Sequence, residues 1–162
     1  MSYGAHFRLK KLTSEAPRLM PLEGLRWVDD PAQQEIVAAV ARREVTMAAS
    51  DRGSWRWQAP IMQPDPIDAE LIAAATAEAG GKKDLPGLAR LEYIRWAEGQ
   101  CAQLLHIGPY ASEAPSIAAL QEAIAEAGYR LRGRHHEIYL GDPRRSAPEK
   151  LRTIIRHPVG PG

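Results

Sequence analysis

The feature that most constrains the fold is a carboxylate in the middle of a short apolar segment. The segment spans residues 134–140, and Glu137 lies at its centre. Side chains alternate between the two faces of a strand. This alternation predicts two sets of side chains, the first facing a helix and the second on the opposite face: His136, Ile138 and Leu140, then His135, Glu137 and Tyr139.

A charge in such a position needs a partner, because burying an unpaired carboxylate costs several kcal/mol. One interpretation is a structural ion pair with an arginine such as Arg152 or Arg156. The other is a ligand-facing acid in a concave pocket. If Glu137 works there as a base near neutral pH, we expect an apolar environment to raise its pKa. The residues alone leave both interpretations open.

Short patterned segments separated by Gly and Pro predict an α+β fold with one domain over residues 1–162. Strands are expected at 19–28, 55–63, 91–97, 100–108, 129–140 and 151–157, with 91–97 and 100–108 forming a hairpin. Helices are expected at 31–44, 69–79 (capped by Asp68) and about 110–128. If the two halves are repeats, residues 1–66 form a shortened first repeat. Residues 67–90 are then a connecting helix and linker, 91–157 a second repeat, and 158–162 a loose tail.

Composition narrows the possible partners. The chain has 21 Lys and Arg against 20 Asp and Glu, a net charge of +1, which argues against nucleic acid as the main partner. No apolar run approaches the length of a membrane helix, and no signal peptide is recognisable, so a cytoplasmic location is expected. The single cysteine, Cys101, lies in an apolar alternation and is read as an inert thiol rather than a nucleophile.

No cofactor or metal is expected. The chain contains neither a P-loop nor a dinucleotide-binding fingerprint. His135 and His136 are adjacent on a predicted strand, so their rings should point to opposite faces and cannot hold one ion together.

Tryptophans on the predicted strands favour a ligand site. Trp27, Trp55 and Trp57 are expected to share one consistent face. Aromatic walls beside one acid suit a flat, cationic or polarised ligand, through stacking and charge pairing. The alternative is that these side chains simply fill the core.

Several motifs resemble those of the GyrI-like small-molecule-binding family. They are His106-Ile107-Gly108-Pro109-Tyr110, residues 128–133, His135-His136-Glu137-Ile138-Tyr139-Leu140, residues 142–145 and 147–151, and, in the first half, residues 20–25, 55–57 and 61–65. The resemblance implies a pair of strand-helix-strand-strand repeats, in an antiparallel sheet with helices on one face and a ligand groove between the repeats. In drug-binding members a strand glutamate meets the ligand, and Glu137 occupies the matching place.

The first half departs from the family pattern. Residues 3–11 resemble the end of the family's first helix, and its opening strand is absent, so the first repeat reads as truncated. An unpaired sheet edge is normally covered, which predicts either a homodimer or a rearranged N-terminal half. Arg26 stands where an aromatic residue is common beside Trp27.

The resemblance implies three functions. The first is hydrolysis of cyclopropane-bearing, DNA-alkylating compounds, with Glu137 as base or water-orienting group and Tyr110 or Tyr139 donating a hydrogen bond to the leaving oxygen. The second is passive binding of a small molecule for sequestration or sensing. The third is protein interaction, as in a gyrase inhibitor. The expected ligand-binding residues are Trp27, Trp55, Trp57, His106, Glu137 and Tyr139.

Overall fold

The computed structural model describes residues 19–41, 51–81 and 85–162, and their contacts divide the chain into two compact units. The first contains Ile61–Ala97 with residues 19–21, and the second contains Leu22–Pro60 and Glu98–Gly162. Residues 3–11 and 42–44, for which helical structure was expected, lie outside the described residues. None of the described helices is long and apolar enough to cross a membrane.

The first unit is organised around helix α3 (Ala69–Gly80). Asp68 caps it as predicted, because its carboxylate accepts a hydrogen bond from the backbone N–H of Leu71 at 2.9 Å. Ile67 and Ala75 form a small core beside the helix. A 3-10 turn, η3 (Pro86–Arg90), follows in the chain.

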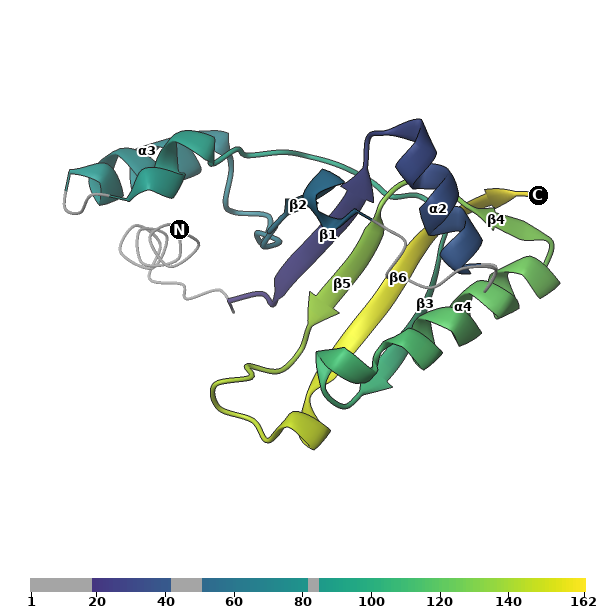
Figure 1. Ribbon diagram of the computed structural model, residues 1–162. Coiled ribbons are helices and arrows are strands. Elements are labelled where there is room, and N and C mark those ends of the chain that lie inside the picture. The colour runs from purple at the N-terminus through teal and green to yellow at the C-terminus, as the bar shows by residue number, and fades with distance from the viewer. Residues whose placement is uncertain (1–18, 42–50, 82–84) are drawn as a thin grey trace. The chain divides into compact units, whose positions relative to one another are not determined.

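The second unit is built on an antiparallel sheet of six strands. The strands are β1 (Leu22–Val28), β2 (Trp55–Gln58), β3 (Cys101–Ile107), β4 (Tyr129–Leu131), β5 (His135–Tyr139) and β6 (Arg152–Pro161). Five strands lie in the order β2-β1-β5-β6-β3, and β4 pairs with the end of β6 (Figure 1). The α+β class and the antiparallel sheet are therefore confirmed.

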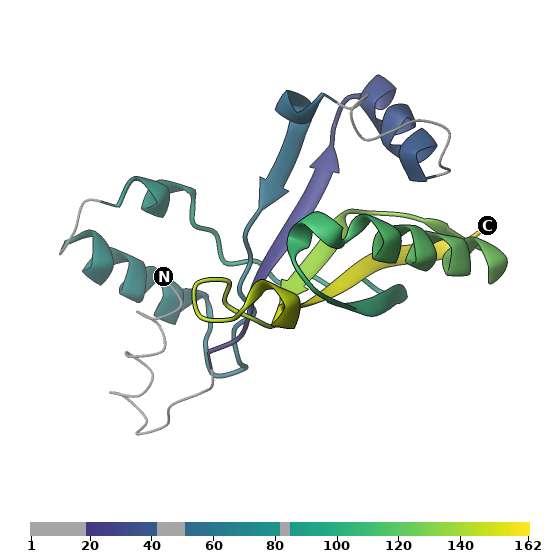
Figure 2. The same cartoon turned by 60° about the horizontal axis from the view of Figure 1, so that its bottom comes forward.

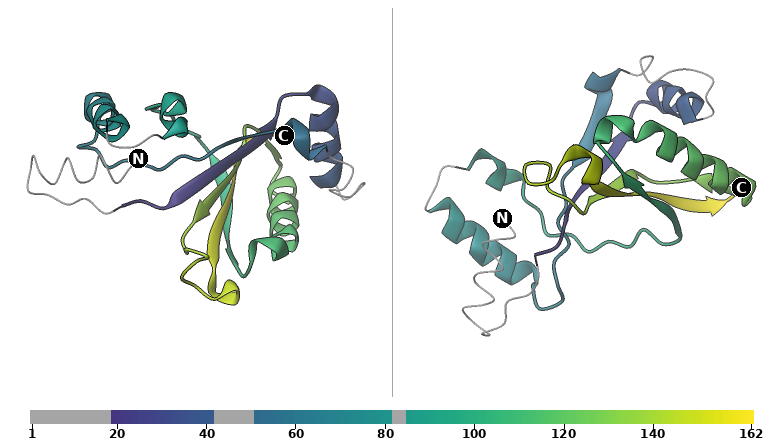
Figure 3. Two further views of the ribbon diagram at one scale, coloured as in Figure 1. Left: turned by 60° about the vertical axis from the view of Figure 1, so that its left-hand side comes forward. Right: turned by 90° about the horizontal axis from the view of Figure 1, so that it is seen from below.

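Two longer helices and three 3-10 turns complete the second unit. They are α2 (Pro31–Ala41), α4 (Ala114–Glu126), η2 (Arg52–Ser54), η4 (Tyr110–Ser112) and η5 (Pro148–Lys150). Helix α4 lies along the sheet (Figures 2 and 3). Its buried residues Leu120 and Ile124 pack against Ile155 and Val159 of β6 and form the main core of this unit.

This packing determines which side of the sheet the helix covers. The pairing register sets Glu137 opposite Ile155, and directly opposed residues of an antiparallel pair share a face. Glu137 therefore lies on the face that carries α4. The alternation within β5 is as predicted, but the expectation that His136 and Ile138 face the helix is wrong. A period of two tells which residues share a face, and only the packing of α4 decides which face is covered.

Three strand predictions need correction. Residues 91–99 form neither helix nor strand, so the expected hairpin is wrong, and β3 pairs with β6 instead. The expected strand 129–140 is broken into β4 and β5 around Gly133, whose φ of +69° suits glycine. The expected loose tail is also wrong, because β6 continues to Pro161 and pairs with β4.

Candidate functional site

Glu137 is almost completely buried, with 1% of its surface exposed, and three side chains donate to its carboxylate. Arg26 Nη1 on β1 lies 2.9 Å from Oε1, and His135 Nε2 lies 2.8 Å from the same oxygen. The Tyr139 hydroxyl donates to Oε2 at 2.7 Å. His135 and Tyr139 lie two residues before and after Glu137 on β5, and residues two apart on a strand share a face.

These contacts bear on the ion-pair interpretation of Glu137. Glu137 does have an ion-pair partner, but the partner is Arg26 rather than Arg152 or Arg156. The register of β1 and β5 explains this pair. Gly24 lies opposite Glu137, and Arg26, two residues further along β1, lies opposite His135. Arg26 therefore shares the face of Glu137. The alternation of side chains within one strand does not show which residues lie beside them on the next strand.

The ionisation of Glu137 is opposite to expectation. Burial by itself raises the pKa of this carboxyl, but the hydrogen bonds from His135 and Tyr139 and the charge of Arg26 outweigh burial and lower the pKa. The prediction of a raised pKa is therefore wrong, and Glu137 is ionised at neutral pH. A carboxylate has about four acceptor positions, so three donors leave one position for a further donor.

A second histidine, His157, contacts the ring nitrogen of His135 that does not face Glu137. His135 Nδ1 and His157 Nε2 are 3.0 Å apart, and their rings are tilted against each other. Burial and the neighbouring His135 lower the pKa of His157 to about 3, so His157 is neutral. The histidine pair fixes the orientation of the ring that holds Glu137.

Tyr139 reaches Glu137 across a residue without a side chain. A Cβ atom on Gly24 would lie 2.8 Å from the Tyr139 hydroxyl oxygen, so glycine leaves the room that the ring needs. Tyr110 packs edge-on against Tyr139, with 5.4 Å between the ring centroids. Burial and the charge of Glu137 raise the pKa of Tyr139, so its hydroxyl keeps the proton that it donates.

A second buried carboxyl on this face was not foreseen. Glu113 precedes α4 and is 5% exposed. Burial, followed by the charge of Glu137, raises the pKa of Glu113. Nothing in the sequence marks it, because an acid just before a helix is ordinarily an exposed cap.

His106 also lies on this face but is held by the protein. The register sets His106 opposite Thr153, which in turn lies opposite Tyr139, so the three residues form one row across β3, β6 and β5. His106 is buried, and its Nδ1 is 2.9 Å from the Ser116 hydroxyl of α4. This contact joins the edge strand to the helix.

The tryptophans divide between the two faces. Trp57 lies opposite Arg26 and Trp55 opposite Val28, so both share the face of Glu137, and Trp57 is 69% exposed. Trp27 lies on the other face, where the guanidinium carbon of Arg134 is 3.8 Å from the ring centroid. The expectation that all three share one face is therefore wrong, since Trp27 and Trp57 belong to opposite alternations of neighbouring strands.

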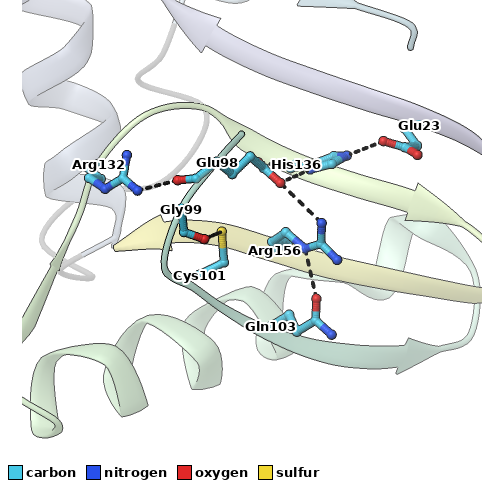
Figure 4. A network of polar contacts seen from close by, with 8 residues as sticks. All are labelled: Glu23, Glu98, Gly99, Cys101, Gln103, Arg132, His136 and Arg156. Atoms are coloured by element: carbon cyan, nitrogen blue, oxygen red, sulfur yellow. Dashed lines mark hydrogen bonds and ion pairs between the residues drawn. The ribbon is translucent and has the colours of Figure 1, made fainter. Parts of the chain in front are cut away.

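The opposite face carries a separate polar network, drawn in Figure 4. His136 is 2% exposed and lies between Glu23, at 2.9 Å, and Glu98, at 3.0 Å. Arg156 donates to Glu98 at 3.2 Å and to Gln103 at 2.9 Å. Burial lowers the pKa of His136, but hydrogen bonds to the two glutamates more than reverse this, so the pKa is raised. Two basic side chains are thus paired with two acidic ones, which is the pattern of a structural network.

The remaining candidates for chemistry are Cys101 and possible metal ligands. Burial and the charge of Glu98 raise the pKa of Cys101, which keeps it as a thiol. Among the described residues, no group of three or more His, Cys, Asp and Glu side chains is placed to hold a metal ion.

Comparisons with known proteins concern the family and the fold of this chain. The family model described as GyrI-like small molecule binding domain matches residues 57–159. An uncharacterized conserved protein from Listeria innocua is 29% identical, with a TM-score of 0.80, over 98% of this chain and 74% of that chain. A hydrolase from Listeria innocua is 28% identical, with a TM-score of 0.73 and the same coverage. None of the curated proteins matches.

Proposed function

This chain belongs to the GyrI-like small molecule binding domain family, and from that premise we propose that it binds flat, neutral electrophiles beside Glu137 and hydrolyses them. The observation that carries the proposal is a buried carboxylate that stays ionised and retains one acceptor position. A water molecule donating to that position would be oriented for attack on an electrophilic carbon.

The charge of the site favours a neutral ligand over a cation. Arg26 lies 2.9 Å from Glu137, so the pair has little net charge to offer an incoming ammonium or pyridinium group. A cation would have to displace Arg26 and leave its guanidinium without this partner. We therefore propose polarised, uncharged aromatic compounds as the ligand class, stacked on Trp55 and Trp57, which share this face.

The reaction we propose is opening of a cyclopropane conjugated to a carbonyl group. The water oxygen forms a bond to a ring CH2 carbon, and the ring C–C bond breaks. Its electron pair moves through the conjugated system to the carbonyl oxygen, which takes up a proton. Glu137 accepts the proton that the water loses. A lowered pKa makes Glu137 a weak base, which suffices for a strained ring whose opening needs an oriented water.

Tyr110 and Tyr139 have different parts in this proposal. Tyr139 is engaged with Glu137 and fixes the carboxylate. Tyr110 is 38% exposed and contacts Tyr139 by its ring edge, so its hydroxyl is better placed to donate to the ligand. We propose His106 as a support for the start of α4, through Ser116.

The test uses a spirocyclopropyl cyclohexadienone as the probe. Loss of dienone absorbance measures turnover, and mass spectrometry in 18O-labelled water identifies the oxygen that enters the product. Glu137→Gln should lower kcat by about 10²-fold or more, while Trp fluorescence quenching by the probe changes little. Glu126→Gln, an exposed acid at the end of α4, is the matched control. A wild-type protein that leaves the probe unchanged refutes the hydrolase.

Passive sequestration is the second candidate, and the same lowered pKa favours it, because a strongly held carboxylate is a poor base. It predicts tight binding of the probe with no 18O-labelled product. In that case Arg26→Gln, which removes the counter-charge, should strengthen binding of a flat cation relative to the neutral probe. Equal changes for the two ligands would argue against charge selection by this pair.

We also propose that the chain forms one domain with two related repeats and assembles as a homodimer. Within the described residues, the sheet of the second unit ends on β2 and β3, whose outer edges are open to pairing. Sedimentation equilibrium at micromolar concentration should show a dimer. A monomer at all concentrations would contradict edge covering by a second copy.

A further inference from the structure

On the face of the sheet that carries α4, one carboxyl oxygen is buried for no obvious reason. Glu113 is 5% exposed, and its Oε1 has no hydrogen-bond partner in the described part of the chain. The hydroxyl oxygen of Thr153, which is 0% exposed, also has no hydrogen bond of ordinary geometry, although it lies near enough to the Glu113 carboxyl to lower the pKa of that group. Buried polar atoms are nearly always paired, so two unpaired ones together require an explanation.

Geometry places both groups with the proposed site. Thr153 lies opposite Tyr139 in the register of β5 and β6, and Tyr139 holds Glu137. Glu113 ends the turn η4, where its backbone N–H donates to the carbonyl of Tyr110 at 3.2 Å. Tyr110 packs against Tyr139. The unpaired atoms therefore belong to the end of the helix-bearing face where the two tyrosines meet.

We propose that Glu113 is the second carboxyl of this site and that, in its protonated form, it donates its proton to the carbonyl oxygen of the ligand. The inference rests on the proposed function, which it deepens by assigning the acid. It also narrows the ligand class to compounds with a hydrogen-bond-accepting oxygen conjugated to the electrophilic carbon.

The surroundings of Glu113 favour the neutral acid. Burial and the charge of Glu137 raise its pKa, and an interaction with the Thr153 hydroxyl and the positive charges of His106 and Arg26 only partly oppose them. Charged or titratable groups reach it from several elements: Arg26 on β1, His106 on β3, Tyr110 on η4, and Glu137 and Tyr139 on β5. The environments of Glu113 and Glu137 thus push their pKa values apart, which is the usual sign of an acid and a base working together.

Glu113 is a better proton donor than the nearby tyrosines. Burial, Glu113 and Glu137 raise the pKa of Tyr110 above that of an ordinary phenol. Tyr139 is committed to Glu137. A carboxyl group is a much stronger acid than either phenol, so Glu113 can transfer a proton in a step where Tyr110 contributes only a hydrogen bond.

The two carboxyl groups account for both proton transfers in the reaction. In the ring opening described above, Glu113 gives its proton to the carbonyl oxygen as the electron pair arrives there. Glu137 takes the proton released by the attacking water. After turnover the two carboxyls have exchanged protonation states, and exchange with solvent restores the starting form. In total, one water molecule is added to the ligand. Its OH group is bonded to the former ring carbon, and a proton is bonded to the former carbonyl oxygen.

The first experiment needs no ligand. Protein labelled with 13C at the glutamate side-chain carboxyl is titrated by NMR, and the two signals are assigned with Glu113→Gln and Glu137→Gln. We expect Glu113 to titrate above, and Glu137 below, the ordinary glutamate pKa of about 4.3. A Glu113 signal that titrates at or below this value overturns the inference, whatever the protein binds. Glu113→Asp provides the assignment if Glu113→Gln does not fold.

The second experiment measures kcat/KM against pH with the spirocyclopropyl cyclohexadienone. The wild type should give a bell-shaped profile, since Glu137 must be ionised and Glu113 protonated. Glu113→Gln should lose the alkaline limb and about 10²-fold in kcat, with less than about a 3-fold change in probe affinity. Glu113→Asp should keep the alkaline limb. Glu126→Gln should match the wild type.

The outcomes separate the two proposals. A wild-type protein that does not open the probe overturns the hydrolase and proton donation with it. A wild type that opens the probe, with a Glu113→Gln variant of unchanged rate and profile, overturns the role of Glu113 alone. A variant that loses thermal stability and affinity together but keeps the alkaline limb assigns Glu113 a structural role, which also overturns the inference.

Discussion

Replacing Arg26 by Gln tests the electrostatics of the site most directly. The change keeps a polar but shorter side chain and removes the charge that lies 2.9 Å from Glu137 and 3.2 Å from the Tyr139 hydroxyl. Glu137 is 1% exposed, so bulk solvent compensates only weakly for the lost partner at the carboxylate. The variant therefore leaves a buried carboxylate with fewer compensating groups.

The magnitude follows from the partners. A hydrogen bond to a charged group contributes roughly 1.5–3 kcal/mol. The Arg26 side chain is 43% exposed, so solvent screens part of its interaction. We expect the free energy of unfolding to fall by about 2 kcal/mol, and the Tm by about 6 °C for a chain of this size.

The pH dependence gives the reasoning a second check. The pKa of Glu137 is lowered in the folded protein, so its stabilising contribution is present above the ordinary carboxyl pKa. It is lost as the pH falls through the lowered folded value. Urea unfolding followed by circular dichroism should therefore show a large difference between wild type and Arg26→Gln at pH 7, and a smaller one near pH 3.5.

Arg56→Gln is the matched control on the same sheet. Arg56 pairs with Asp29 at 3.1 Å, but both side chains are well exposed, at 66% and 64%. Its loss should change the free energy of unfolding by less than about 0.5 kcal/mol. Equal effects of the two substitutions, or an Arg26→Gln effect that does not diminish in acid, would refute the account of Glu137.

Three further substitutions probe the same sheet. Gly24→Ala should tilt the Tyr139 ring away from Glu137, because the new Cβ meets its hydroxyl at 2.8 Å; thermal unfolding should show a loss of about 1–2 kcal/mol, and an unchanged Tm would contradict the close approach. His136→Gln removes a cation from between two glutamates and should destabilise by about 3 kcal/mol below neutral pH. The pKa of His136 is raised in the folded protein, so this difference should shrink as the pH rises through the folded value, and growth in alkali would refute the assignment. Ile155→Ala, at a fully buried position under α4, should lose about 2–5 kcal/mol in urea unfolding, whereas a loss below 1 kcal/mol would mean that this core is poorly packed.

Sequence reasoning captured what depends on neighbours along the chain. Alternation put His135, Glu137 and Tyr139 on one face, and the Asp68 cap and α3 followed from local signals. The motifs around Glu137 indicated the family that the comparison shows.

Sequence reasoning failed where a residue's contacts come from a different strand or helix. Arg26 read as a departure in an aromatic wall, yet it is the ion-pair partner that changes the ionisation of Glu137. Glu113 was not singled out from the sequence, and its burial depends on α4 lying against β3 and β6. The tail was misread because Gly160 and Pro161 suggest a loop, although β4 pairs with both. Cross-strand register, which no single-strand pattern contains, decides all three.

The position of β6 has a consequence for biosynthesis. It follows every other strand in the chain, yet it lies between β5 and β3 and also pairs with β4. A ribosome therefore releases β1 to β5 before the strand that joins β5 to β3 exists, and Ile155 and Val159 reach α4 last. Until then the inner edges of β3 and β5 are open to other chains, so nascent protein should depend on chaperones more than the finished fold suggests.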